Sequence, residues 1–471
     1  MSKPLRVYPL DPRELSEEQL AVVFAMTSRR PEPFDEIARM VTQEKAADFH
    51  ERWVLNYGHS SVAEHAVLHI AVENLSRLAC DTLEDNRLAS YTEKSSRFQI
   101  YERGYYHTPD ELQGHALRSL FVDTCDSLFE SYSSMVDDLR GYLASIRPRQ
   151  ENERDGAYNL RIRREATDTA RFILPTATLT NVGITLNARS LEHALRKLLS
   201  SDLTEERNLG ESLKEQGRTI TPTLIKYAER NDYLVHTRKA LREGAIAALL
   251  KDRWQEKLEQ DPNHDNQLAN LVYWDPEAEE KVAVALLYHI GNESYSRVLD
   301  KVRAMKEAEI QLVIEQALEQ LGPHDIPVRE LEAVDYTFDF LMDYGAYREF
   351  KRHRMQTYIP QALTVEHGYV IPPLVSAAGL EDSFFQAMRN AELAFQKVNF
   401  EFPRVAEYLV THAHKRRVLS KLNLRECYHL FKLRTGPDTH FSLVWVMQAA
   451  LDAARERHPV LYKHIRLRSD K

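Results

Sequence analysis

Apolar residues recur at helical spacing over three long stretches, Leu112–Arg140, Arg238–Leu258 and Glu277–Leu318. These stretches contain almost no glycine or proline, and apolar side chains three or four positions apart share one face of a helix. Two shorter runs, Val67–Val72 and Asp335–Leu341, are rich in β-branched or aromatic residues, which is typical of strands. The pattern predicts a mixed protein of long helices and short strands.

The chain also resembles itself. Two matches share one offset along the chain: Asn187-Ala-Arg189 with His193 matches Asn423-Leu-Arg425 with His429, and Ala170–Pro175 matches Ala406–Thr411. Two others share a second, larger offset: Glu64–Asn74 matches Leu331–Leu341, and Ser90–Phe98 matches Thr357–Val365. We predict a tandem duplication, with a first repeat at residues 1–235, a charged helical connector at 236–270 and a second repeat at 271–471. The predicted fold class is α+β, each repeat being an antiparallel sheet with long helices.

Composition narrows the class of protein. A chain of 471 residues suits two or three domains, and 43% hydrophobic with 28% charged residues is ordinary for a globular protein. A net charge of −9 argues against a general nucleic-acid binder. The three cysteines are far apart and suit a reducing compartment, while neither a signal peptide nor a membrane-spanning stretch is recognised. We therefore expect a cytoplasmic protein with small-molecule ligands.

The consecutive residues Arg352, His353 and Arg354 are the first candidate for chemistry. Consecutive side chains point in different directions and so reach different neighbours. Arginine offers a planar fork that suits phosphate, and histidine titrates near neutrality. A solvated basic turn is the alternative interpretation of this tripeptide.

A set of motifs in both repeats is similar to the flavin-dependent thymidylate synthases. That family has Arg-His-Arg, seven residues and then a serine, with glutamate two before the serine and arginine two after it. Later in the chain it has Ala-Arg-x-x-Leu-Pro, Asn-x-Arg-x-Leu and finally a Leu-Arg pair. The first repeat has Gly58–His65 (GHSSVAEH), Glu93–Arg97 (EKSSR), ARFILP and NARSLEH. The second has RHR at 352–354, NLRECYH at 423–429 and KLRTG at 432–436. The resemblance covers most of both halves.

Each repeat has lost the motif residues that the other retains. In the first, Asp85-Asn86-Arg87 stands in place of Arg-His-Arg, and Lys197-Leu198 in place of the later Leu-Arg pair. In the second, the hallmark glutamate, serine and following arginine have become Pro360, Ala362 and Thr364, and Ala-Arg has become Ala406-Glu407.

Two interpretations of these losses are open. The family resembles a homotetramer whose sites are shared between subunits, so two complementary repeats could pool their surviving groups, and a homodimer would then mimic the tetramer. The other interpretation is decay, in which a paralogue keeps the fold without catalysis.

The resemblance implies reductive methylation of dUMP to dTMP with methylenetetrahydrofolate, reduced FAD as hydride donor and NADPH as reductant. It assigns substrate binding to Glu93, Ser95, Ser96, Arg97, Arg171 and Arg434, of which Ser95 and Arg434 would be catalytic. It assigns cofactor binding to His59, His65, Arg352, His353, Arg354, Asn187, Arg189, His193, Asn423, Arg425 and His429. No glycine-rich dinucleotide loop is present, so a Rossmann mode is not expected.

Structural alternatives accompany these assignments. Asn187 and Asn423 suit helix N-caps, Arg434 suits a helix C-terminus, and the stem of Arg171 suits the covering of apolar surface. His59, Glu64 and His65 could converge on a metal, but they lack the HExxH pattern, so no metal site is predicted. An altered relative that acts on another pyrimidine nucleotide, or a non-catalytic flavin or nucleotide binder, is the alternative function.

Overall fold

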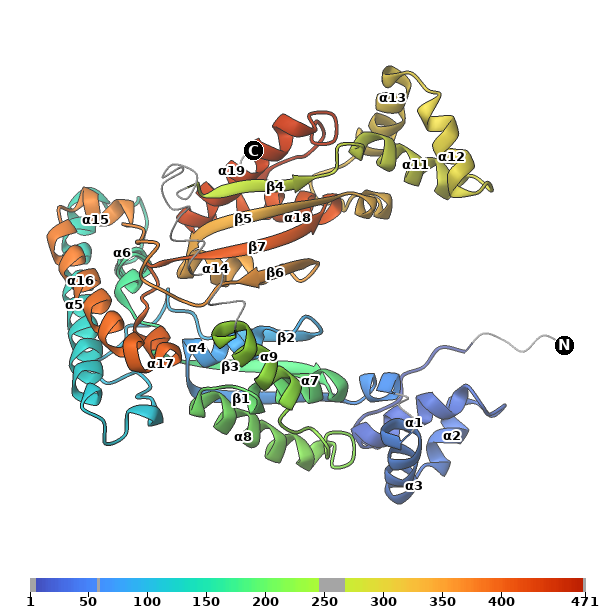
Figure 1. Cartoon of the computed structure of the whole chain (residues 1–471), viewed down its shortest axis with the longest axis horizontal. Helices are drawn as coiled ribbons and strands as arrows, with labels where there is room; N and C mark the ends of the chain where they lie inside the picture. The colour runs from blue at the N-terminus through green and yellow to red at the C-terminus, as the bar shows by residue number, and fades with distance from the viewer. Residues whose placement is uncertain (1–5, 57–59, 245–266, 469–471) are drawn as a thin grey trace. The chain divides into compact units, whose positions relative to one another are not determined.

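The computed structural model describes residues 6–56, 60–244 and 267–468, which form two compact units (Figure 1). Unit 1 comprises Met1–Asp168, Leu174–Glu256 and Leu393–Leu409. Unit 2 comprises Thr169–Ile173, Lys257–Glu392 and Val410–Lys471. Each unit therefore contains a short segment of the repeat that makes up most of the other.

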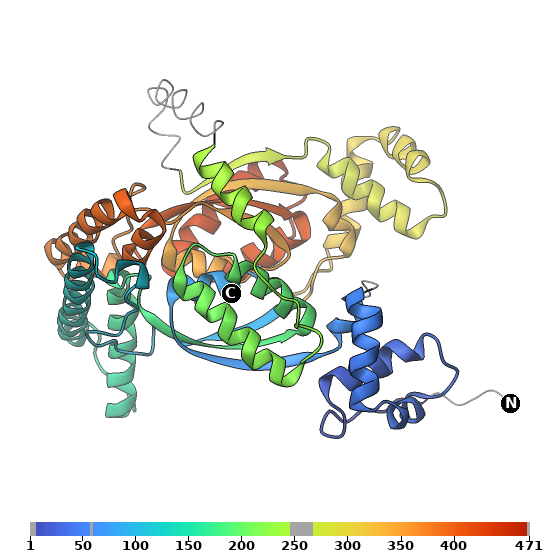
Figure 2. The ribbon, with the colours of Figure 1, turned by 60° about the horizontal axis from the view of Figure 1, so that its bottom comes forward.

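Unit 1 is built on a three-stranded antiparallel sheet of order β1-β3-β2. The strands are β1 (Val67–Ser76), β2 (Ala89–Glu93) and β3 (Leu179–Asn187). The helices are α1 (Glu17–Thr27), α2 (Phe34–Met40), α3 (Gln43–Phe49), α4 (Arg77–Glu84), α5 (Leu117–Ile146), most of α6 (Asp155–Ala170), α7 (Ala188–Leu199), α8 (Thr204–Ile220), α9 (Asp232–Glu243) and α17 (Pro403–Ala406). Alternate residues of β3 are buried, and α7 and α8 lie along the sheet, so their apolar faces close one core (Figure 2).

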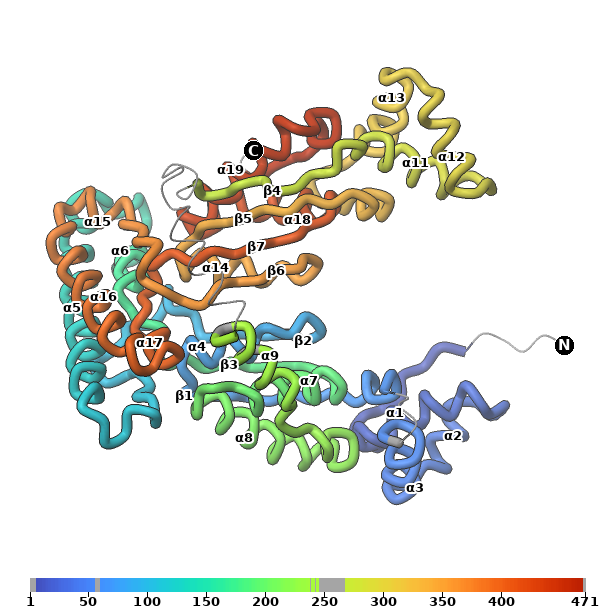
Figure 3. Tube along the Cα trace, viewed as in Figure 1, coloured from blue at the N-terminus to red at the C-terminus, as the bar shows by residue number. Residues whose placement is uncertain are grey.

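Unit 2 has a four-stranded antiparallel sheet of order β4-β5-β7-β6. The strands are β4 (Ala269–Trp274), β5 (Asp335–Asp343), β6 (Gln356–Pro360) and β7 (Lys415–Asn423). The helices are α11 (Ala278–Ile290), α12 (Tyr295–Arg303), α13 (Glu307–Leu318), α14 (Tyr344–Phe350), α15 (Pro373–Ala377), part of α16 (Glu381–Glu401), α18 (Leu424–Arg434) and α19 (Phe441–Arg457). The helices α11, α12 and α13 are inserted in the chain between β4 and β5 and extend away from the sheet (Figure 3).

Three strands of each sheet correspond in order and register. Ala89 pairs with Leu186 in unit 1, and the residues at the equivalent positions of the second repeat, Gln356 and Leu422, pair with each other in unit 2. The larger of the two offsets therefore relates β2 to β6, and the smaller offset relates β3 to β7. The antiparallel sheets predicted for the two repeats are both present.

The strand β1 contains a bulge that its counterpart β5 lacks. The register shifts after Val72, where Asn74 adopts a φ of 60°. Before the bulge, Ala66 corresponds to Val334, because the Ala188 and Leu424 amides donate to these two carbonyls. The first repeat thus holds one extra residue between this point and β2. The predicted match of Glu64–Asn74 with Leu331–Leu341 was wrong by this one inserted residue.

Equivalent backbone bonds join the exchanged segments. In unit 1 the Ala177 amide donates to the Tyr408 carbonyl at 2.9 Å. In unit 2 the Ala413 amide donates to the Phe172 carbonyl at 3.1 Å, and Ala413 and Phe172 are the counterparts of Ala177 and Tyr408 in the other repeat. The two bonds occupy equivalent positions of the two repeats, which fits the predicted duplication.

Helix boundaries differ from the predicted stretches where capping residues intervene. The stretch Glu277–Leu318 is three helices, because Gly291 follows α11 and Ser294 and Lys306 stand at the N-caps of α12 and α13. The predicted connector at 236–270 is helical up to Glu243, residues 245–266 lie outside the described part, and β4 begins at Ala269. In the described ranges, no helix combines the length and apolar character that crossing a membrane requires.

Candidate functional site

Arg434 and His353, which sequence reasoning assigned to different ligands, touch each other in unit 2. Arg434 is the last residue of α18, and its Nε donates to Nε2 of His353 at 2.9 Å. The other ring nitrogen of His353 lies 3.1 Å from Oε1 of Glu426. Because a guanidinium can only donate, Nε2 is the acceptor, and the His353 proton sits on Nδ1 facing the carboxylate.

Burial keeps His353 neutral. Only 4% of this residue is exposed, and burial lowers the pKa of its ring because a charged imidazolium is poorly solvated there. The bond to Glu426 opposes this lowering, whereas the nearby Arg434 cation adds to it. A pKa below the usual value leaves the ring neutral at pH 7, so it can accept from Arg434.

Two further contacts extend this arrangement to Arg171. An oxygen of Glu349 lies 3.5 Å from Nη1 of Arg434 and accepts from the backbone amide of His440 at 3.4 Å. The Nδ1 atom of His440 lies 3.4 Å from Nη2 of Arg171. We call these connected side chains the arginine–histidine network: Arg171, Glu349, His353, Glu426, Arg434 and His440. Arg171 comes from the first repeat and the other five from the second, and all belong to unit 2.

The two arginines that flank His353 are exposed. Within the described ranges, no hydrogen bond or ion pair holds the guanidinium of Arg352 or Arg354. His429 is exposed as well, with its ring centroid 5.3 Å from that of His353. Cationic and donor groups are therefore available beside the buried histidine, which is the chemistry that phosphate groups require.

Unit 1 lacks every charged member of the network at the corresponding positions. The four residues that correspond to Glu349, His353, Glu426 and Arg434 are Thr82, Asn86, Ser190 and Leu198. Leu198 lies in the apolar core, and the Asn86 amide donates to the Leu83 carbonyl. A buried charged network that lost one member would leave its partners uncompensated, so joint replacement is the stable outcome.

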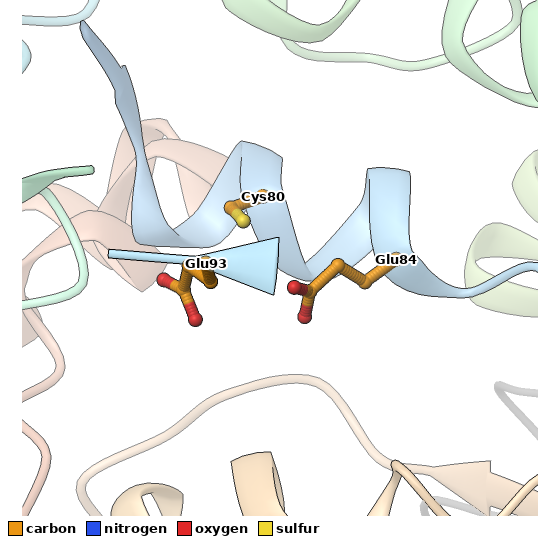
Figure 4. Close-up of side chains that lie close together, drawn as sticks. All are labelled: Cys80, Glu84 and Glu93. Atoms are coloured by element: carbon orange, nitrogen blue, oxygen red, sulfur yellow. The ribbon is translucent and has the colours of Figure 1, made fainter. Parts of the chain in front are cut away.

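Glu93, a predicted substrate ligand, is engaged in a buried ion pair of unit 1. Arg77 is 1% exposed, and its Nη1 donates to Oε1 of Glu93 at 2.6 Å while Nη2 donates to the Tyr101 hydroxyl at 2.8 Å. Cys80 and Glu84 lie next to Glu93, with ligand atoms of the three within 4.8 Å of one another (Figure 4). The Arg77 cation already balances the charge of Glu93, so this carboxylate is engaged in an ion pair.

The other predicted substrate ligands of unit 1 interact locally. The Nε atom of Arg97 lies 3.1 Å from Oδ1 of Asp168, and the Arg97 amide donates to the Ser95 hydroxyl oxygen at 3.3 Å. Ser96 is buried, with 1% exposure. The substrate roles of these three residues stay predictions.

Several predicted cofactor ligands have structural partners. Asn187 and Asn423 cap α7 and α18 by accepting from the Ser190 and Glu426 amides, each at 2.8 Å, as in the alternative interpretation. Arg189 pairs with Glu64, and Arg425 pairs with Glu332 at 2.7 Å. Their roles toward a flavin remain predictions.

The predicted histidine ligands of the first repeat have varied surroundings. His65 stacks on Phe24 at 4.8 Å between ring centroids. The pKa of His193 is lowered, first by burial and then by the nearby Lys197 cation. His59 lies outside the described residues.

Sequence reasoning missed Glu349, Glu426 and His440. None of the three was assigned a role, although Glu349 lies shortly before Arg352 and Glu426 lies inside the quoted segment NLRECYH. A charged residue beside a motif is a weak signal, since most such residues face water. His440 lies outside every quoted motif, so nothing marked it as a site residue.

Comparison with known proteins gives the family. The model of the family described as "Thymidylate synthase complementing protein" matches residues 13–223 and again residues 270–460. A UPF0159 protein of Chlamydia muridarum is 34% identical over 430 residues, covering 88% of this chain and 79% of that protein. A UPF0159 protein of Thermoplasma acidophilum is 28% identical over 454 residues, covering 89% of this chain and 88% of that protein.

Other matches cover less than half of this chain. A flavin-dependent thymidylate synthase of Clostridium tetani is 27% identical over 214 residues, covering 45% of this chain and 82% of that protein. Among solved structures, a flavin dependent thymidylate synthase from Helicobacter pylori complexed with FAD and dUMP aligns with a TM-score of 0.32 and 12% identity, covering 42% of this chain and 100% of that chain.

Proposed function

Since the chain belongs to the thymidylate synthase complementing protein family, we propose that it is a flavin-dependent thymidylate synthase-like enzyme. It converts dUMP to dTMP by reductive methylation, with methylenetetrahydrofolate as carbon donor, FAD as cofactor and NADPH as reductant. The observation that carries this proposal is the arginine–histidine network, in which Arg171 of the first repeat is connected to Arg434 and His353 of the second. If the chain were a paralogue that had lost catalysis, there would be no reason for the residues of the arginine–histidine network to be retained together in one unit.

The proposed roles follow from the chemistry of the side chains. Arg171 binds the nucleotide phosphate through charge-assisted hydrogen bonds. Arg434 stabilises the negative charge that develops on the uracil ring as the carbon electrophile reacts. The neutral His353 ring and Glu349 hold the Arg434 guanidinium from two sides, which reduces the reorganisation needed during the reaction.

The residues present fit a flavin dinucleotide. The exposed Arg352 and Arg354 guanidinium groups suit its pyrophosphate, and His429 adds a ring nitrogen beside His353. When bound, the reduced flavin supplies the hydride of the reaction. Arg97 and Ser95 are proposed as further phosphate ligands, and a cytoplasmic homodimer is proposed as the assembly that pools the half-sites.

Enzyme assay tests the proposal directly. The full chain, supplied with dUMP, methylenetetrahydrofolate, FAD and NADPH, is expected to form dTMP and to carry flavin absorbance when purified. A yellow protein that methylates another pyrimidine nucleotide but not dUMP would favour an altered relative. A colourless protein that binds neither FAD nor dUMP would favour the non-catalytic alternative and overturn the proposal.

We predict that the Arg-His-Arg tripeptide of the second repeat alone retains the flavin. Arg352→Ala removes a charge-assisted bond to phosphate, which contributes roughly 1.5–3 kcal/mol, and so weakens FAD binding about tenfold or more. Arg87→Ala, in the corresponding Asp85-Asn86-Arg87 of the first repeat, leaves FAD binding nearly unchanged. Flavin absorbance after gel filtration, followed by FAD titration of the apoproteins, measures both effects. Equal losses in the two variants would contradict the division of roles between the repeats.

A further inference from the structure

His440 occupies a position in unit 2 that no sequence motif marks. Its side chain is 2% exposed, and its ring lies between Phe172 and Phe441, at centroid distances of 5.1 Å and 4.9 Å. One ring nitrogen faces Arg171 at 3.4 Å, and the other lies 3.6 Å from Oδ1 of Asp343. The imidazole therefore connects a buried carboxylate to the arginine that the first repeat contributes.

The neighbours of His440 dictate its tautomer. A guanidinium has donors only, so Nδ1 must present a lone pair to Arg171. The proton then sits on Nε2 and points toward Asp343, an acceptor whose side chain is 1% exposed. In the described part of the chain, Nε2 of His440 and Oδ2 of Asp343 are both buried without a hydrogen-bond partner. Buried polar atoms are normally hydrogen-bonded, and a small movement of the ring toward the carboxylate would let Nε2 donate a hydrogen bond to Asp343.

The local sequence fixes Asp343 in place. Asp343 is the N-cap of α14, where Oδ1 accepts from the Ala346 amide at 2.9 Å. Gly345 lets the two groups approach, because a Cβ there would lie 3.0 Å from that oxygen and 3.3 Å from Nε2 of His440. Any larger residue at 345 would push the imidazole and the carboxylate apart.

None of the three residues is kept at the corresponding positions of unit 1. Asp343 and Arg171 correspond to Ser76 and Glu407, and His440, the N-cap of α19, corresponds to Leu203, the N-cap of α8. Ser76 donates instead to Glu205, through its amide at 2.7 Å and its hydroxyl at 2.6 Å, and Glu407 pairs with Arg404. The carboxylate, imidazole and guanidinium thus occur together in the unit that also holds Arg434 and His353.

We propose that Asp343 and His440 are a positioning pair for Arg171. Asp343 holds His440 in the Nε2-protonated tautomer, and the Nδ1 lone pair then fixes the Arg171 guanidinium in the orientation that receives the nucleotide phosphate. The inference rests on the proposed function for the identity of that phosphate. Glu349 links the pair to Arg434, because one of its oxygens meets both the His440 amide and the Arg434 guanidinium.

Three variants separate positioning from packing. His440→Ala removes the acceptor for Arg171 and is expected to weaken dUMP binding about tenfold to a hundredfold, with turnover at saturating dUMP changed less than about threefold. His440→Asn places an amide oxygen near the Nδ1 position and should restore binding to within about threefold of the wild type. Asp343→Ser keeps a hydroxyl at the N-cap but removes the carboxylate that faces Nε2, so the Nε2-protonated tautomer loses its acceptor and binding should weaken as in His440→Ala.

The matched control is His458→Ala. His458 is another buried histidine of unit 2, and its Nδ1 lies 2.8 Å from the Tyr336 hydroxyl. Its loss should leave dUMP affinity unchanged while it lowers the melting temperature. If His440→Ala binds dUMP as the wild type does, or if His440→Asn is as weak as His440→Ala, the positioning pair is wrong.

A spectroscopic measurement keeps this test separate from the proposed function. Long-range ¹H–¹⁵N correlation of ¹⁵N-histidine-labelled full chain, with the His440 signal assigned by its loss in His440→Asn, reports the tautomer without any nucleotide. We expect the Nε2-protonated form to dominate in the wild type and both tautomers to be populated in Asp343→Ser, where the carboxylate is gone. An Nδ1-protonated or doubly protonated ring in the wild type overturns the inference. Absence of dUMP binding by a wild type with the expected tautomer overturns the proposed function instead.

Discussion

Replacing Arg434 with alanine is expected to lower dTMP formation about a hundredfold to a thousandfold, the effect of removing one preorganised donor to a developing negative charge. The guanidinium is held by His353 on one side and by Glu349 on the other, so it costs little reorganisation when the uracil ring becomes negative. Because this stabilisation acts in the transition state, kcat and kcat/KM should fall together. Steady-state kinetics with varied dUMP, under saturating folate donor and NADPH, measures both constants.

The controls for this prediction lie on the same helix. Lys432→Ala removes a nearby cation, whose Nζ lies 3.5 Å from the Asp325 carbonyl, and should leave both constants within about twofold of the wild type. Arg434→Lys keeps the charge without the planar fork and should recover only part of the loss. A rise in KM with unchanged kcat in Arg434→Ala would mean that this arginine binds the ground state and the transition state alike, and the assigned role would fail.

The sheets were the part of the fold that the sequence pattern predicted best. The runs Val67–Val72 and Asp335–Leu341 lie in β1 and β5, since alternation and β-branched residues report directly on a buried strand face. The bulge in β1 was not predictable, because one inserted residue shifts a register without changing composition. The order of the strands could not be predicted from the sequence pattern, because it depends on which strands pair after folding.

The candidate site was predictable only for residues that a motif carries. Arg171, His353 and Arg434 were named from their motifs, and the structure brings all three into unit 2. Their partners Glu349, Glu426 and His440 depend on which polar groups meet after folding, and periodicity carries no information about that. The repeated Asn-x-Arg motif also has a local structural cause, because Asn187 and Asn423 cap helices, as the alternative interpretation predicted.

The second large effect is expected in unit 1, where Glu93→Gln should destabilise the fold by about 3–5 kcal/mol, the cost of leaving a buried partner charge uncompensated. The Arg77 side chain is fully buried and that of Glu93 is 5% exposed, so water cannot replace the lost carboxylate. Hydrogen exchange of the β2 and β3 amides follows the stability of this sheet locally, since the two units need not unfold together. Urea unfolding monitored by circular dichroism provides the global comparison.

Two further variants decide whether Glu93 acts through this pair or through a ligand. Glu130→Gln makes the same chemical change in an exposed pair with Arg103 and should cost less than about 1 kcal/mol. Removing both charges with Arg77→Met and Glu93→Leu should recover most of the lost stability, because a buried pair is readily replaced by apolar groups. The second repeat has made such a double change, with Tyr344 and Pro360 at the corresponding positions. If Glu93→Gln instead keeps its stability and loses dUMP affinity, the carboxylate serves the nucleotide, as its motif predicts, and the ion pair is incidental.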